Sequence, residues 1–225
     1  MLTVSPTLEG TVMTEFATYA PGLLLAFTAL TLALLSPGPS VLAILGVALG
    51  QGRKSAVAMA FGVGIGSTCW ALLTVLGLSA LIAVSATALI IIKIAGGGYL
   101  LWLAYKSFRA ATLPFDPTVT ETDAADGRLG KFVAQGLAIH LTNPKAAFAW
   151  VSIAALGMQP GAPAWVGAAL VCGAAVLSCG INAFYALAFS TKSVFDIYLK
   201  ARRGIQFGLG PFFTLAGLKL ITSRV

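Results

Sequence analysis

The sequence predicts an all-α membrane protein with six transmembrane helices in a three-plus-three inverted repeat, in which helices 1 and 4 are broken. Hydrophobic residues make up 58% of the 225 residues and charged residues only 9%, a composition typical of a polytopic membrane protein. Six apolar segments follow one another along the chain. Two of them are interrupted by proline at corresponding places in the two halves, which indicates an internal repeat.

The first segment covers 16–50 and carries no charge. A helix needs only about 20 apolar residues to span a bilayer, so this segment is too long for one straight span. It contains Ser36-Pro37-Gly38-Pro39-Ser40, and proline breaks or kinks a helix because it lacks an N–H and clashes with the preceding turn. Broken backbone in a membrane is tolerated where it is buried in protein or lines a wet cavity. The alternative is a kink that only improves packing.

The next two segments run over 55–84 and 86–109. Gly62, Gly64 and Gly66 lie on or near one face of the first of these, and such faces let helices approach closely in lipid. The second ends in aromatic residues followed by basic ones, which is typical of a helix end at the membrane surface.

The second half repeats this order. A segment over 132–157 is interrupted at Leu141-Thr142-Asn143-Pro144-Lys145, a segment over 162–190 follows, and a basic link over 191–203 precedes the last segment at 204–222. The interruptions lie 106 residues apart. Because each half has an odd number of spans, the two halves are expected to have opposite orientations in the membrane.

The chain is therefore divided into four regions. Residues 1–15 are a polar N-terminal extension, 16–109 the first three-helix repeat, 110–131 a hydrophilic cytoplasmic linker and 132–225 the second repeat. The extension has no Lys or Arg, unlike the basic start of a cleaved signal peptide. We therefore expect the first span to be retained.

Basic residues are distributed unequally between the two sides. Ten lie on the side of the linker and two, Lys219 and Arg224, on the other. Positive residues favour the cytoplasmic side, so both termini are predicted to be non-cytoplasmic. The ten are Arg53, Lys54, Lys106, Arg109, Arg128, Lys131, Lys192, Lys200, Arg202 and Arg203.

The composition excludes several functions. All seven acidic residues lie in loops or the N-terminal extension, which argues against a metal-ion or cation carrier and against an enzyme, because no carboxylate pair is available. We expect no metal and no cofactor. There is no basic stripe with interleaved aromatic residues, so no nucleic-acid partner is expected. Cys69, Cys172 and Cys179 lie in apolar segments without a CxxC pattern.

Two lysines and one histidine lie inside the predicted spans. Lys145 follows the second break, where a helix N-terminus and a cation together favour an anion such as a carboxylate; snorkelling to the cytoplasmic surface is the alternative. Lys93 lies near a helix end and is expected to snorkel. His140 is a possible proton relay, because its unperturbed pKa lies near neutrality; a hydrogen-bonded packing role is the alternative.

Five motifs follow one another along the chain. They are Ser-Pro-Gly-Pro at 36–39, Gly52-Arg53-Lys54, Gly62-x-x-x-Gly66, Lys93-x-x-Gly96-Gly97-x-Tyr99-Leu100-x-x-Leu103 and Leu141-Thr142-Asn143-Pro144-Lys145-Ala146. Taken in this order, they resemble the lysine-exporter family in its homoserine/threonine-exporter branch, the LysE/RhtB translocators. The resemblance covers roughly 16–222. It implies a six-span bacterial inner-membrane protein that exports amino acids or similar metabolites, driven by the proton gradient. Ser40 departs from the family, where Asn is expected.

We therefore predict an efflux transporter for small zwitterionic metabolites, with membrane lipid as its other partner. The substrate-binding residues are expected to be Pro37, Gly38, Pro39, Ser40, Asn143, Pro144 and Lys145, with His140 as the proton relay. Lys145 and the helix N-termini would hold a carboxylate, and backbone carbonyls with Asn143 an ammonium. Two alternatives remain at this point: a thiol–disulfide electron carrier using Cys69 and Cys172, and a non-transporting structural protein. Assembly into homo-oligomers is left open.

Overall fold

The part of the chain that the structure describes forms eight α-helices and contains no strand. This structure is a computed structural model, and it describes residues 6–36, 38–84, 86–113, 129–159 and 161–223. Pro37 and most of the 110–131 linker lie outside these residues. The all-helical class predicted from the sequence is confirmed.

Both predicted breaks are present. α1 (Pro6–Leu35) ends before the Pro-Gly-Pro, and α2 (Pro39–Gly50) begins at its second proline. In the same way, α5 (Leu129–Leu141) ends before Asn143, and α6 (Pro144–Gly157) begins directly after it. The other helices are α3 (Gly52–Val84), α4 (Ala86–Thr112), α7 (Ala164–Ala188) and α8 (Lys192–Thr222).

Two helices are longer than the apolar segments that predicted them. α8 begins at Lys192, whereas the sequence predicts a basic link over 191–203. α1 begins at Pro6, inside the expected N-terminal extension. Residues 192–203 contain neither Gly nor Pro, and Lys, Arg, Leu and Ala are good helix formers. Hydropathy indicates which part of a helix suits lipid, so it does not locate a helix end that lies in water.

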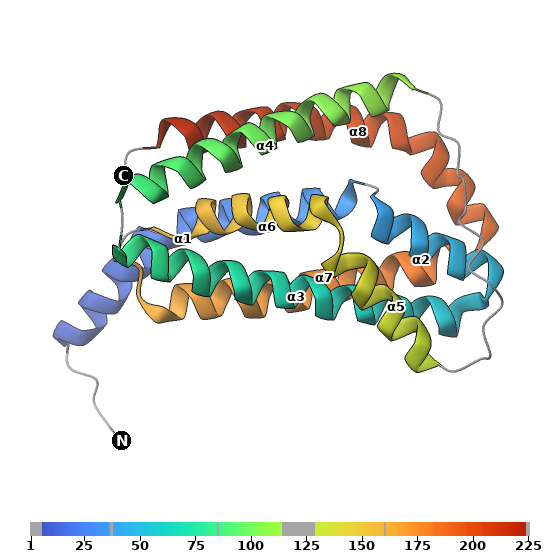
Figure 1. Cartoon of the computed structure of the whole chain (residues 1–225), viewed down its shortest axis with the longest axis horizontal. Coiled ribbons are helices and arrows are strands. Elements are labelled where there is room, and N and C mark those ends of the chain that lie inside the picture. Colours follow the sequence, from blue (N-terminus) through green and yellow to red (C-terminus); the bar gives the residue numbers. More distant parts are fainter. Residues whose placement is uncertain (1–5, 37, 85, 114–128, 160, 224–225) are drawn as a thin grey trace.

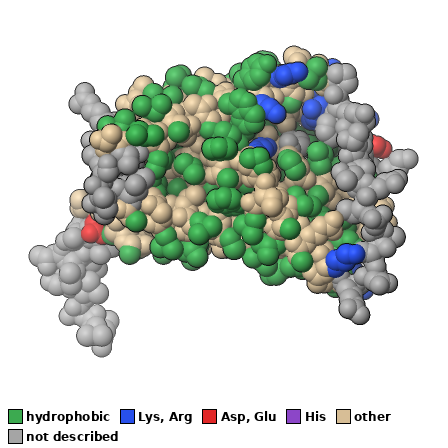
Figure 2. All heavy atoms as spheres, viewed as in Figure 1, with side chains coloured by type: hydrophobic (Ala, Val, Ile, Leu, Met, Phe, Trp, Pro, Cys, Tyr) green, Lys and Arg blue, Asp and Glu red, His purple; other side chains and the backbone are tan. Residues whose placement is uncertain are grey.

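Four helices within the described residues are long and apolar enough to cross a bilayer, namely Met13–Leu35, Gly52–Ala80, Ala164–Ala188 and Asp196–Thr222. Large apolar side chains such as Leu24, Leu73 and Phe184 point outward and are exposed, as expected of a surface that lipid covers. Figure 2 shows apolar side chains across the middle of the molecule. The chain is a multi-pass helical membrane protein, and the count of six spans stays a prediction.

The helices form three layers in the view of Figure 1. α4 and α8 run antiparallel along each other in one outer layer, and α3 and α7 run antiparallel in the other, where α5 packs against α3. α1 and α6 lie side by side between these layers. Both helix breaks therefore lie in the interior of the bundle, with a helix pair on either side.

Glycines allow the close packing of α3 against α5 and α7. A Cβ atom on Gly62 would collide with the Val133 carbonyl of α5, and one on Gly64 with the Cys179 side chain of α7. A Cβ on Gly66 would lie 3.0 Å from that of His140. The predicted role of these glycines in close helix approach is confirmed, and it fixes where α5 presents His140.

Candidate functional site

The two helices that follow the breaks begin differently. In α6, Asn143 is the N-cap, and its side-chain oxygen accepts a hydrogen bond of 3.0 Å from the Lys145 backbone N–H. In α2, the N-cap is Gly38, which offers no side chain. The first N–H groups of a helix have no partner within the helix, so α2 presents Ser40 and Val41 N–H groups that no side chain caps. Such an N-terminus favours an anion.

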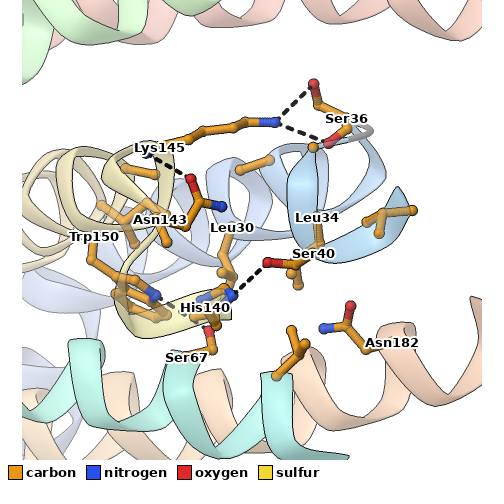
Figure 3. A pocket seen from close by; sticks show the side chains of 17 residues that line it. Leu30, Leu34, Ser36, Ser40, Ser67, His140, Asn143, Lys145, Trp150 and Asn182 are labelled. Carbon is orange, nitrogen blue, oxygen red and sulfur yellow. Dashed lines mark hydrogen bonds between the residues drawn. The ribbon is translucent and has the colours of Figure 1, made fainter. Parts of the chain in front are cut away.

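Lys145 connects the two breaks. Its ammonium donates hydrogen bonds to the Ser36 carbonyl at 3.0 Å and to the Ser36 hydroxyl at 3.3 Å (Figure 3). Its own carbonyl accepts a hydrogen bond of 2.9 Å from the Tyr99 hydroxyl of α4. A Cβ atom on Gly38 would lie 3.3 Å from the Lys145 Nζ atom, so glycine at this position makes room for the lysine.

His140 lies near the end of α5 and meets the start of α2. Its Nδ1 atom is 3.2 Å from the Ser40 hydroxyl, and both side chains are buried. The Nε2 atom is also buried, and it has no hydrogen-bond partner in the part of the chain that the structure describes. An orphaned ring nitrogen is costly in a simple packing role, and it leaves a position at which a proton or a polar ligand can bind.

These side chains line a small cavity, which we call the inner cavity. It has a volume of about 60 Å³ and lies on the side of the breaks that faces α3 and α7 (Figure 3). Ser36, Gly38, Asn143 and Lys145 form one wall. This volume exceeds the roughly 15 Å³ that a cavity needs to hold a water molecule, so the inner cavity can contain water.

A second, larger space lies on the opposite side of the breaks, toward α4 and α8. This outer cavity has a volume of about 540 Å³. Ser36, Gly38, Asn143 and Lys145 line it too. The same four residues therefore separate the two cavities, with the hydrogen bonds between Lys145 and Ser36 in the dividing wall.

The structure adds polar residues that sequence reasoning missed. Asn182 of α7 is 1% exposed and lines the inner cavity; it lies in an otherwise apolar stretch, and this polarity could have identified it. Ser36 is part of the Pro-Gly-Pro motif, but its role became evident only when the fold placed Lys145 beside it. The indole N–H of Trp150 donates to Ser67, whose hydroxyl is 2.8 Å from that of Ser178.

The predicted site residues are largely brought together. Gly38, Ser40, Asn143, Lys145 and His140 line the inner cavity, and Pro39 and Pro144 line the outer one. Pro37 is not among the described residues.

Lys93 lies elsewhere, in a cavity of about 460 Å³ that Lys219 also lines. The three cysteines are free, and no group of metal-binding side chains occurs among the residues that the structure describes.

Paired helix breaks around a lysine inside a multi-pass bundle define the class as a membrane transport protein. The chain belongs to the LysE type translocator family, whose model matches residues 31–224. It is an efflux transporter of the inner membrane and not an enzyme. The family resemblance seen in the motifs is thereby confirmed.

Several relatives of this chain are named as efflux proteins. The chain is 29% identical over 196 residues to a threonine efflux protein of Salmonella typhi, covering 85% of this chain and 93% of the relative. It is 35% identical over 115 residues to a homoserine/homoserine lactone efflux protein of Salmonella typhimurium, covering 51% and 54%. An uncharacterized membrane protein of Escherichia coli, YahN, is 27% identical over 190 residues, covering 84% of each. No solved structure matches.

Proposed function

We propose that this protein exports small amino acids with an uncharged side chain. The observation that carries the proposal is Lys145, which lies between two broken helices and lines both cavities. Among the described residues, none that lines either cavity is Asp or Glu, so a second substrate ammonium, as in lysine, would find no counter-charge from them. Relatives named for threonine, homoserine and leucine efflux agree with this substrate class.

In the proposed complex, the substrate carboxylate binds between the Lys145 ammonium and the uncapped N-terminus of α2. The Ser40 and Val41 N–H groups lie at this N-terminus, where the helix dipole and the unpaired N–H groups favour an anion. The Asn143 oxygen is already used in its own helix cap, so Asn143 is proposed to donate its NH₂ group to the carboxylate and not to bind the ammonium, which is the role that the sequence predicts. The Ser36 carbonyl, released when Lys145 turns to the substrate, becomes an acceptor for the substrate ammonium.

His140 is proposed to couple efflux to the proton gradient. Its Nδ1 atom is engaged with Ser40, and its Nε2 atom is buried without a partner. Ser40 in turn lies in the first turn of α2, where the carboxylate is proposed to bind. Protonation of His140 would therefore alter the charge next to the carboxylate site, which is the requirement for linking substrate and proton binding.

The six-span inverted repeat is proposed as the framework. α4 and α8 would be equivalent third helices, and α3 and α7 equivalent second helices. Each of these two pairs packs antiparallel, as helices related by a twofold axis in the membrane plane do. α4 has 27 residues, and α5 with α6 would form the broken fourth span. Both termini are proposed to be non-cytoplasmic, with the 110–131 linker in the cytoplasm.

Transport by reconstituted protein tests the function. Vesicles containing the purified chain are loaded with radiolabelled L-threonine, L-homoserine, L-leucine or L-lysine, and substrate exit is followed with and without an imposed proton gradient. We expect saturable exit of at least one of the three neutral amino acids, faster with the gradient, and little exit of lysine. Absence of exit for all three neutral substrates would reject the proposed substrate class.

A further inference from the structure

Two buried polar side chains of the outer cavity have no role in the site described above. Ser107 of α4 and Gln206 of α8 are each 3% exposed, and both line this cavity. Neither side chain hydrogen-bonds to another residue in the part of the chain that the structure describes. Their polar atoms are not among the enclosed atoms that lack a partner, so they are open to the cavity, where a polar ligand can hydrogen-bond to them.

The charge of the outer cavity indicates what that ligand carries. Lys106 and Lys145 both line the cavity, and none of the described residues that line it is acidic. The Lys106 ammonium lies 4.8 Å from the centre of the Trp102 ring, which holds it over the cavity wall. Two ammonium groups with an amide and a hydroxyl form a set of donors suited to a carboxylate.

Size separates the two cavities as well. The outer cavity has about 540 Å³, within the range of pockets that bind small molecules, whereas the inner one has about 60 Å³. The outer cavity therefore has space for a complete amino acid beside the helix breaks. The inner cavity, as it stands, has space for only part of one.

We propose that the outer cavity is a second substrate-binding site, at which Lys106, Ser107 and Gln206 hold the carboxylate of an amino acid before it reaches the helix breaks. Lys145 lines both cavities, so its ammonium can release Ser36 and accept the carboxylate from this site. The substrate then passes from the outer to the inner cavity through the wall that Lys145 and Ser36 form. This inference rests on the proposed export of amino acids.

Substitutions at the outer site test the proposal through the concentration dependence of efflux. In vesicles loaded with graded concentrations of L-threonine, Gln206→Leu and Ser107→Ala are expected to raise the half-saturating concentration about tenfold, because a hydrogen bond to a charged group is lost. The maximal rate should change by less than about twofold, because the inner site is intact. Thr214→Val on α8 is the matched control, since its hydroxyl bonds only within its own helix and lies outside both cavities.

A binding measurement complements the transport assay and does not depend on turnover. With Cys69, Cys172 and Cys179 replaced by alanine, Gln206→Cys is labelled with a maleimide in the presence and absence of L-threonine. We expect L-threonine to slow the labelling of Gln206→Cys. Labelling of Lys131→Cys, an exposed position on α5, should be unaffected.

The outcomes distinguish this inference from the proposed function. If L-threonine, L-homoserine and L-leucine are not exported by the wild-type chain, both are overturned. If one is exported but the two variants keep wild-type half-saturation and that substrate does not slow labelling, the second site alone is overturned. Slower labelling in vesicles with phosphatidylglycerol than with phosphatidylcholine, without any effect of the substrate, would assign the cavity to a lipid phosphate and likewise overturn it.

Discussion

At the scale of single residues, Lys145 resolves a conflict that its position creates. A cation in the first turn of a helix is disfavoured by the helix dipole, and Lys145 is the second residue of α6. The structure supplies the compensating group, because the Ser36 carbonyl follows the last residue of α1 and accepts from Lys145 at 3.0 Å. Carbonyls at a helix C-terminus lack partners within the helix. The hydrogen bond therefore gives a partner both to the carbonyl at the first break and to the ammonium at the second.

Substitution of Lys145 should affect transport more than folding. A hydrogen bond to a charged group contributes about 1.5–3 kcal/mol, so Lys145→Ala should weaken apparent substrate affinity by roughly ten- to a hundredfold. Lys145→Arg should retain partial transport because it keeps the charge in a different geometry, and Lys145→Glu should be the most damaging. The measurement is efflux normalised to membrane-inserted protein. Equal normalised efflux for Lys145→Ala and the wild type would contradict a role of Lys145 in substrate binding. Its hydrogen bonds to Ser36 would then serve only to separate the two cavities.

His140 can be tested separately from substrate binding. His140→Gln keeps a group that can hydrogen-bond Ser40 but cannot take up a proton near neutral pH. We expect this variant to exchange labelled for unlabelled substrate across the membrane at a rate near that of the wild type. It should lose the acceleration that a proton gradient gives to net efflux. Retention of that acceleration would restrict His140 to packing.

At the scale of helices, the first break depends on more than one proline. α1 continues through Pro21 and α8 through Pro211 without interruption, whereas the chain leaves the helix between Leu35 and Pro39. One proline removes a single hydrogen bond and typically kinks a helix. Two prolines around a glycine remove two donors and add a residue of low helix propensity, which makes a complete break more favourable.

The first break should therefore be essential for transport but not for insertion. The double variant Pro37→Ala/Pro39→Ala keeps the apolar length and should reach the membrane in normal amounts. It should lose efflux, because a continuous helix would move Ser36 away from Lys145 and close the N-terminus of α2. Pro211→Ala is the control that removes a proline from an unbroken helix. Wild-type efflux by the double variant would show that an uninterrupted first span is sufficient.

The contact between α3 and α5 depends on glycine. A Cβ atom on Gly62 would overlap the Val133 carbonyl, so Gly62→Ala must force the two helices apart, whereas nothing lies within 4 Å of a Cβ on Gly77 of the same helix. Overpacking costs about 1–3 kcal/mol. We expect Gly62→Ala to lower the midpoint of thermal unfolding in detergent and Gly77→Ala to leave it unchanged or higher. Equal midpoints would contradict the close approach of α3 and α5.

At the scale of the whole molecule, charge is distributed along the long axis of the bundle. In Figure 2 the visible Lys and Arg side chains gather at one end, and Figure 1 places the start of α3 and the ends of α4 and α7 at that same end. The C-terminal end of α8 lies at the opposite end. An excess of basic residues marks the cytoplasmic side, so the arrangement in space agrees with the orientation proposed from the sequence.

Accessibility of single cysteines tests this orientation. In a chain whose three native cysteines are replaced by alanine, Lys131→Cys should resist a membrane-impermeant thiol reagent in intact cells and react after the cells are opened. Gln159→Cys, at the other end of the bundle, should react in intact cells. The reverse pattern would invert the proposed topology, and equal reaction at both positions would contradict an odd number of crossings between them.

The sequence by itself determined the helical membrane class, the positions of both breaks and most of the residues around them. These features are local, because lipid solvates any sufficiently apolar helix and proline and glycine interrupt a helix wherever they occur. The predicted start of α8 was wrong because hydropathy reports only the apolar part of a helix. It does not show that the helix continues beyond that part into water.

Only the tertiary structure decided which groups meet at the breaks. Ser36 and Lys145 are 109 residues apart, Ser40 and His140 are 100 apart, and Asn182 reaches the same cavity from another helix. These pairings depend on how closely α3 approaches α5 and α7 through glycine contacts. They also depend on which side of the layer formed by α1 and α6 each cavity opens. These are properties of helix packing over the whole bundle, and no spacing along the chain specifies them.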